Sequence, residues 1–309
     1  MARPTQMSVL VPTHFLGDLP TPADFLSWFR AAEDLGFASI WILDRIYSPS
    51  KVPDAMTMLA WASAVTSRIR LGTAVLLLPH RHPILLAKEV STIDYLSGGR
   101  LDLGIGLGGR EIEFHSLGMR LEERVRRFRD NLASMRAIWS GPDAAFEGRF
   151  VSFENVNIEP RPVQKEDMPI WIGGEADGVL KRTAELADGW IGGARNSPEI
   201  LAEKIGKIKA FAKDRGRDPD SLGYASLEYL TIDEDVEKAR ARNQGLATSV
   251  YGPAFDSDTY TTFGDLDTCV ARLQAVVDAG CNEVIIAPPD LDVAHLTRIA
   301  EEVVPAVRI

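Results

Sequence analysis

Three glycine-rich segments carry the residue types that a large bound ligand requires. They are 104–109 (GIGLGG), 173–175 (GGE) and 192–195 (GGAR). The first satisfies the pattern GxGxxG after a predicted strand, which is the fingerprint of Rossmann dinucleotide sites. That fingerprint normally opens its domain and leads into a long helix, whereas this one follows the fourth predicted strand and residues 110–114 begin no long apolar-faced helix. We therefore expect these glycines to let a planar or phosphorylated ligand approach the backbone; a tight turn without a ligand is the alternative.

The segment 173–175 leads into a predicted helix and is a candidate anion site. The free N–H groups and the positive dipole end of a helix N-terminus favour an anion such as phosphate. Arg195 follows the next glycine pair, and we expect it to lie near that phosphate and to donate a charge-assisted hydrogen bond. A solvated surface arginine is the alternative.

Histidines offer two further kinds of chemistry. His80 and His82 form an HxH pair at a strand end, which is a possible start of a hydrolytic metal site. No later predicted strand end supplies the missing ligands, so we predict no metal site. A GxSxG nucleophile motif does not occur either. His14 and His80 remain candidates for proton transfer, because imidazole titrates near neutral pH.

Composition limits the classes of partner. The 309 residues are 45% hydrophobic and 25% charged, as in an ordinary globular protein, and the formal charge of −10 disfavours nucleic acid and anionic membranes. We expect small-molecule partners. Cys269 and Cys281 show no CxxC or metal spacing and are expected to be buried free thiols. The apolar run near the N-terminus is too short for a secretion signal or a membrane span, which predicts a cytoplasmic protein.

The elements that position these residues alternate between short apolar runs and longer amphipathic stretches. The predicted strands are Met7–Val11, Ser39–Leu43, Ile69–Leu77, Leu101–Ile105, Pro169–Ile172, Gly189–Ile191, Tyr224–Ile232 and Glu283–Ala287. Eight strands that alternate with helices predict an α/β protein with the (β/α)8 TIM-barrel fold, as one domain over residues 1–309. Residues 141–167 show two-residue periodicity, which indicates a hairpin-like insertion between the fourth helix and the fifth strand. Barrel chemistry occurs where strands end, so the glycine segments and histidines are expected at one mouth.

Several of these segments resemble, in the same order, the bacterial luciferase-like monooxygenase superfamily. They are 39–45 (SIWILDR), 68–75 (RIRLGTAV), 78–83 (LPHRHP), 96–106 (LSGGRLDLGIG), 160–162 (PRP), 169–174 (PIWIGG) and 187–190 (ADGW). That family is a barrel with an insertion, binds reduced FMN or the deazaflavin coenzyme F420, and is usually dimeric. The chain is most similar to the short members that depend on coenzyme F420.

The resemblance implies a set of cofactor-binding residues. It places a bulge with a non-proline cis peptide at Ala74–Val75 under the cofactor ring and Asp44 at the polar edge of that ring. The remaining segments would hold the side chain and phosphate of the cofactor. The implied set is Asp44, Thr73, Ala74, Val75, Gly106, Leu107, Gly108, Gly109, Gly173, Gly174, Glu175, Ala176, Gly193, Ala194 and Arg195.

Two positions depart from the family pattern. Family members commonly carry histidine where this chain has Arg45, and the sugar-phosphate dehydrogenases among them use glutamate where it has Gly109. A guanidinium is always protonated and is no general base. We expect Arg45 to bind a substrate carboxylate or negative charge on the reduced ring, while His14 or His80 handles protons. The predicted catalytic residues are therefore His14, Arg45 and His80.

The resemblance implies hydride transfer between a deazaflavin and a small organic substrate. A two-component FMN-dependent monooxygenase is the alternative, and a non-catalytic flavin-binding protein is an alternative from another class. We also expect a homodimer that buries apolar faces around Met56–Ala64 and Leu85–Ile93.

Overall fold

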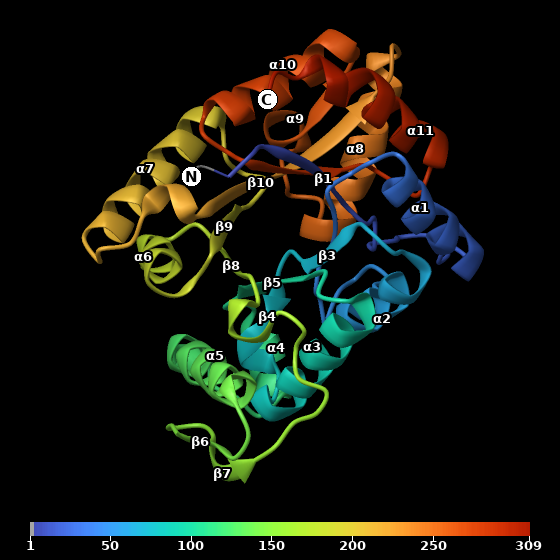
Figure 1. The fold of residues 1–309 in the computed structure, drawn as a ribbon. Helices are drawn as coiled ribbons and strands as arrows, with labels where there is room; N and C mark the ends of the chain where they lie inside the picture. The colour runs from blue at the N-terminus through green and yellow to red at the C-terminus, as the bar shows by residue number, and fades with distance from the viewer. Residues whose placement is uncertain (1–2) are drawn as a thin grey trace.

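The chain folds into a closed barrel of eight parallel strands surrounded by helices (Figure 1). The computed structural model describes residues 3–309. The barrel strands are β1 (Gln6–Leu10), β2 (Ser39–Ile42), β3 (Arg70–Thr73), β5 (Leu101–Gly106), β8 (Ile170–Gly173), β9 (Gly189–Gly192), β10 (Gly223–Ile232) and β12 (Glu283–Ala287). Each pairs with its neighbours in parallel, and the pairing of β10 with both β9 and β12 closes the ring. The predicted TIM barrel is confirmed, and each predicted strand has its counterpart.

Helices follow the strands and cover the outside of the barrel. They are α1 (Pro22–Asp34), α2 (Ala55–Val65), α3 (Pro83–Ser97), α5 (Arg124–Ser140), α6 (Asp177–Leu186), α7 (Pro198–Lys213), α8 (Val236–Tyr251), α10 (Leu266–Asp278) and α11 (Val293–Arg298). Local signals fix their ends: Thr21 and Asp24 form a capping box at the start of α1, and Gly98 ends α3 with a φ of 71°. The last helix is not α-helical throughout, because α11 passes into a π-helix at Ile299–Val303.

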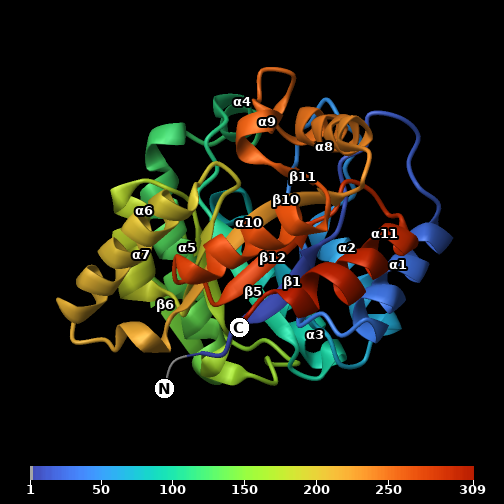
Figure 2. The ribbon, with the colours of Figure 1, turned by 90° about the horizontal axis from the view of Figure 1, so that it is seen from above.

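Shorter elements lie between these units. The hairpin of β6 (Ala144–Glu147) and β7 (Ser152–Val156) lies between α5 and β8 and is antiparallel. The third predicted strand is split into β3 and β4 (Leu76–Leu77), and the interruption contains the predicted cis peptide at Ala74–Val75, which is confirmed. A short α4 (Glu111–Ser116) follows β5, and α9 (Ser257–Tyr260) and β11 (Thr262–Gly264) follow α8. In Figure 2, α4, α8 and α9 gather at one end of the molecule.

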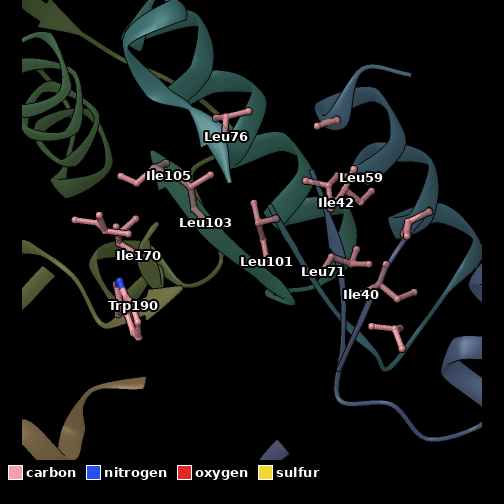
Figure 3. Close-up of a cluster of buried hydrophobic side chains, with 14 of the residues drawn as sticks. Ile40, Ile42, Leu59, Leu71, Leu76, Leu101, Leu103, Ile105, Ile170 and Trp190 are labelled. Carbon is pink, nitrogen blue, oxygen red and sulfur yellow. The ribbon is translucent and has the colours of Figure 1, made fainter. Parts of the chain in front are cut away.

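Alternate residues of the strands fill two separate cores. The outward-facing set packs against the helices, and Figure 3 shows Leu59 of α2 beside Ile42 of β2. The inward-facing set includes Trp41 and Trp171, whose rings meet edge to face with centroids 5.7 Å apart. A Cβ at Gly189 or Gly223 would collide with the Trp171 ring, so glycine at these positions makes room for the indole. The two tryptophans fill the barrel beneath the mouth at the C-terminal strand ends.

None of the helices between residues 3 and 309 is long and apolar enough to cross a membrane.

Candidate active site

A cavity of about 450 Å³ opens at the C-terminal ends of the strands, where the barrel fold places chemistry. Its walls come from strand ends around most of the barrel and from the end of α8. The lining residues are Leu43, Ala74, Val75, Leu77, Gly106, Leu107, Gly108, Arg124, Gly173, Gly174, Glu175, Ala176, Val179, Ile191, Gly193, Leu227 and Tyr251. Apolar side chains and glycine backbone make up most of this surface. Such a lining suits a large planar ligand.

Much of the predicted cofactor set meets in this mouth cavity. The predicted residues that line it are Ala74, Val75, Gly106, Leu107, Gly108, Gly173, Gly174, Glu175, Ala176 and Gly193. They come from four segments of the chain, 74–75, 106–108, 173–176 and 193, and the closure of the barrel brings these segments together.

The Val75 side chain lies between two of the glycine segments. A Cβ at Gly106 would lie 2.6 Å from Val75 Cγ2, and a Cβ at Gly173 would lie 2.7 Å from Val75 Cγ1. These distances are too short for carbon atoms in contact, so both glycines are required for this packing.

Other members of the predicted set lie outside the lining. Asp44 is buried and accepts hydrogen bonds from the Leu77 N–H (3.0 Å) and from Arg81 Nη2 (3.1 Å). The Thr73 hydroxyl donates to the Gly104 carbonyl at 2.6 Å. Gly109 and Ala194 do not line the cavity, although their neighbours Gly108 and Gly193 do. Asp44 and Thr73 therefore fix the strand ends on both sides of Ala74–Val75.

Arg195 lies over aromatic rings at the edge of the mouth. Its guanidinium carbon is 5.2 Å from the ring centroid of Phe255 and 6.0 Å from that of Tyr251. The Tyr251 and Phe255 rings are themselves stacked, with centroids 4.4 Å apart. This arrangement is a cation–π contact next to the cavity.

His80 lies behind the glycine loop of β5. Its ring packs edge-on against Phe114, with centroids 4.4 Å apart, and a Cβ at Gly108 would lie 3.2 Å from His80 Nε2. The ring is buried, and within residues 3–309 neither nitrogen has a hydrogen-bond partner. Burial lowers the pKa of His80 below its usual value, while nearby Asp44 acts in the opposite direction. His80 is therefore close to the cavity but separated from it by Gly108.

His14 and Arg45 lie on the other side of the mouth, near the end of α8. His14 is buried, and burial followed by the charge of Arg45 lowers its pKa to about 4. Arg45 Nη2 donates to the Val250 carbonyl at 3.4 Å. At neutral pH His14 is therefore an uncharged imidazole, and neither His14 nor Arg45 is among the residues that line the mouth cavity.

Two polar lining residues, Arg124 and Tyr251, were missed by sequence reasoning. Arg124 is the first residue of α5, where a positive charge interacts unfavourably with the helix dipole. An arginine-rich run (124–129, RVRRFR) at the start of a helix is therefore the sequence feature that could have indicated an anion-binding role for Arg124. Tyr251 ends α8, and its hydroxyl accepts a hydrogen bond from the Tyr229 hydroxyl at 3.2 Å. No motif in the sequence marks Tyr251, because its position depends on how α8 packs across the mouth.

Two features that favour an anion line the cavity. They are the Arg124 guanidinium and the N-terminus of α6, whose N-cap residue Ala176 has no side-chain hydrogen bond to the first turn. The Val179 N–H already donates to the Ala176 carbonyl at 2.7 Å, so the N–H groups of Asp177 and Gly178 are the ones left for an anion. The Glu175 carboxylate is engaged elsewhere: it accepts a hydrogen bond from the Gly193 N–H at 2.6 Å and forms an ion pair with Lys204.

These features define a (β/α)8 barrel with a large, mostly apolar cavity at the C-terminal ends of its strands. Residues 5–262 match the family model described as luciferase-like monooxygenase. The chain belongs to this family.

Similar proteins of known activity include reductases and oxygenases. The 5,10-methylenetetrahydromethanopterin reductase of Methanopyrus kandleri is 26% identical over 341 residues, which cover 93% of this chain and 95% of the reductase. The structure of an F420-dependent secondary alcohol dehydrogenase with an F420-acetone adduct has a TM-score of 0.86 at 21% identity, covering 99% and 100% of the two chains. The FMN-bound oxygenating constituent of 3,6-diketocamphane monooxygenase from Pseudomonas putida has a TM-score of 0.80 at 18% identity, with full coverage of both chains.

Proposed function

We propose that the chain is an oxidoreductase that transfers a hydride between coenzyme F420 and a small organic substrate. The observation that carries this proposal is the mouth cavity, which combines an apolar, glycine-lined wall at Ala74–Val75 with an electropositive end at Arg124. The similarity to an F420-dependent dehydrogenase and to a methylenetetrahydromethanopterin reductase supports the deazaflavin over other planar cofactors.

The residues present fit such a cofactor. Gly106, Gly108 and Gly173 line the cavity together with Ala74 and Val75, and the glycines at 106 and 173 make room for the Val75 side chain that would support a flat ring. Arg124 and the first turn of α6 fit a phosphate. When bound, the deazaflavin supplies a ring carbon that accepts or gives a hydride.

The whole sequence-derived cofactor set is part of this proposal, with Arg124 and Tyr251 added from the structure. Asp44 and Thr73 act by holding the strand ends that carry Ala74 and Val75. Arg195 is proposed to reach the anionic part of the cofactor from the edge of the mouth.

His14, Arg45 and His80 are proposed to serve the substrate and its proton. Burial lowers the pKa of both His14 and His80, so both imidazoles are uncharged at neutral pH and able to accept a proton. Arg45 stays cationic and supplies a fixed charge beside the substrate.

Absorbance measurements without oxygen test this function. The purified chain with oxidised coenzyme F420 is mixed with a series of short secondary alcohols, and in the reverse direction the reduced coenzyme is mixed with the matching ketones. We expect the absorbance of the oxidised coenzyme to fall with at least one alcohol or to rise with the matching ketone. If neither happens with any pair, hydride transfer with this substrate class is excluded.

A flavin-dependent monooxygenase is the second candidate function, favoured by the structural similarity to an FMN-bound oxygenase. Oxygen uptake that requires the chain, reduced FMN and an organic substrate together would establish it. A chain that binds a cofactor but turns over in neither assay would be a non-catalytic flavin-binding protein.

A further inference from the structure

Few of the side chains that line the mouth cavity are polar. Within residues 3–309 they are Arg124, Glu175 and Tyr251. Glu175 already accepts a hydrogen bond from the Gly193 N–H and forms an ion pair with Lys204, and Arg124 carries a positive charge. In this part of the chain, Tyr251 is therefore the one lining residue whose side chain offers an uncharged hydrogen-bond donor to a ligand.

Tyr229 holds the Tyr251 hydroxyl from inside the barrel. Tyr229 lies on β10 two residues after Leu227, which lines the cavity, so both side chains lie on the inner face of this strand. The hydroxyl oxygens of Tyr229 and Tyr251 are 3.2 Å apart, and the two rings meet edge to face with centroids 5.9 Å apart. Tyr229 also belongs to the inner core that contains Ala74. The pair of hydroxyls thus connects that core to the mouth cavity.

Burial decides which of the two hydroxyls donates to the other. Tyr229 is 1% exposed, whereas Tyr251 is 36% exposed. Within residues 3–309 the Tyr229 hydroxyl has no second partner, and a buried hydroxyl proton without an acceptor is unfavourable, so Tyr229 donates to Tyr251. Burial raises the pKa of Tyr229 well above its usual value, so this proton stays in place at neutral pH. The Tyr251 hydroxyl proton is then left for an acceptor in the cavity.

The Tyr251 ring is fixed by its neighbours before any ligand arrives. It is stacked on Phe255, with centroids 4.4 Å apart and an angle of 15° between the ring planes, and the Arg195 guanidinium carbon is 6.0 Å from its centroid. A donor that is held in one direction in advance loses little freedom when a ligand binds. The apolar walls strengthen its hydrogen bond further, because the local dielectric falls when a ligand displaces water.

We propose that the Tyr251 hydroxyl donates a hydrogen bond to the oxygen of an uncharged substrate, a carbonyl compound or the matching alcohol, and that Tyr229 positions this hydroxyl. Addition of a hydride to a carbonyl carbon moves negative charge onto the carbonyl oxygen, where a fixed donor stabilises it. That the bound compound accepts a hydride rests on the proposed function. The hydrogen bond itself requires only the chain and a carbonyl compound.

Infrared spectroscopy of a bound ketone tests this hydrogen bond without turnover. The chain is loaded with oxidised coenzyme F420 and with cyclohexanone that carries ¹³C at its carbonyl, two oxidised compounds between which no hydride passes. We expect the carbonyl band of the bound ketone at lower wavenumber in wild type than in Tyr251→Phe, because a hydrogen-bond donor weakens the C=O bond. Loss of ketone binding in Tyr251→Phe alone would also support the proposal. Equal band positions, or no binding of the ketone to wild type, would overturn it.

Tyr260→Phe is the matched control for this measurement. Tyr260 packs against the same Phe255 ring, with centroids 5.6 Å apart, and is 36% exposed like Tyr251, but it does not line the mouth cavity. This variant should keep the wild-type band, and a shift as large as in Tyr251→Phe would overturn the assignment to Tyr251. In Tyr229→Phe the Tyr251 hydroxyl stays but loses its donor, so we expect an intermediate band. A wild-type band in that variant would overturn the positioning role of Tyr229.

Cofactor titrations separate a contact with the substrate from a contact with the cofactor. Phenylalanine at 251 keeps the ring that lines the cavity, so Tyr251→Phe should bind oxidised coenzyme F420 within about twofold of wild type. Its kcat/KM for ketone reduction should fall by at least about tenfold, because the donor to the substrate oxygen is missing. Weaker coenzyme binding with an unchanged ketone band would assign the hydroxyl to the cofactor and overturn the substrate role. If wild type does not bind the coenzyme, the proposed function fails, and the infrared comparison on the cofactor-free chain still decides the hydrogen bond.

Discussion

Val75 occupies the space that a side chain at Gly173 would need, since a Cβ at that position would lie 2.7 Å from Val75 Cγ1. The contact joins the end of β8 to the Ala74–Val75 interruption between β3 and β4. Glycine at position 173 is therefore required by packing, in addition to its proposed role in cofactor binding.

Gly173→Ala should destabilise the fold and weaken cofactor binding. Forcing a methyl group into a packed site costs about 1–3 kcal/mol, and the displaced Val75 would change the cavity wall. Urea unfolding measures the first effect, and a fluorescence titration with the cofactor measures the second. Gly206→Ala in α7 is the matched control, because an added Cβ there meets nothing within 4 Å. Unchanged stability and affinity in Gly173→Ala would show that the observed packing is not needed.

Arg124→Gln should weaken binding of a phosphorylated cofactor by about tenfold or more, because one charge-assisted contact is lost. FMN and riboflavin, or coenzyme F420 and its dephosphorylated chromophore, form the matched ligand pairs. The form without phosphate should bind wild type and variant within about twofold. Arg126→Gln serves as the control, since Arg126 is exposed on the same helix. A loss of equal size with both ligand forms would contradict a phosphate contact.

Arg195→Ala tests whether Arg195, which the sequence predicts to lie near the cofactor phosphate, contacts that phosphate. A direct phosphate contact predicts a ten- to hundredfold loss of affinity for the phosphorylated cofactor. Its place over the Phe255 ring leads us to expect a smaller loss than in Arg124→Gln. If the loss stays within about twofold, Arg195 makes no phosphate contact.

Glu283 should make stability depend on pH. Burial raises the pKa of this carboxyl from 4.5 to about 7, although Ser8 and Ser39 donate hydrogen bonds to it. The folded chain then binds more protons at Glu283 than the unfolded chain between about pH 4.5 and pH 7, so this group lowers stability as the pH rises through that window. His14 and His295, whose pKa values are lowered to about 4, act in the opposite direction.

The contribution of Glu283 is isolated by comparing wild type with Glu283→Gln at a series of pH values. Glutamine keeps an acceptor oxygen for Ser8 and Ser39 but does not titrate. Relative to wild type, the variant should gain stability from pH 5 to pH 7.5, on the order of 1–3 kcal/mol, as measured by urea unfolding. Parallel pH profiles would contradict the raised pKa.

The proposed homodimer is tested at Leu85. This side chain is 64% exposed on α3, beside a groove between α2 and α3 that Met56 and Ile93 line. Leu85→Glu should convert a dimer into a monomer at micromolar concentration, as measured by sedimentation. Leu16→Glu is the control, because Leu16 is similarly exposed (59%) but lies far from this groove along the chain. This variant should leave the mass of the oligomer unchanged. A monomeric wild type would contradict the dimer itself.

The barrel can be predicted from the sequence because each strand and each helix is marked by a pattern of residues that are neighbours in the chain. Each strand is a short apolar run between helix patterns, and the strand-end rule brings Gly106 and Gly173 to one cavity, whereas Ala74 was placed there by the family resemblance. Arg124 and Tyr251 were missed because they belong to helices whose position over the mouth depends on tertiary packing. The surroundings of Arg195 could not be predicted either, since its ring partner Phe255 follows sixty residues later in a different unit.

A titration of the purified chain with coenzyme F420 and with FMN, each oxidised and reduced, tests the central claim most directly. Cofactor fluorescence or calorimetry measures the affinities. We predict saturable binding of coenzyme F420 with one site per chain, and weaker binding of FMN. Failure of both cofactors, in both redox states, to bind more tightly than about 1 mM, an affinity of only about 4 kcal/mol, would contradict the assignment of the mouth cavity as a deazaflavin or flavin site.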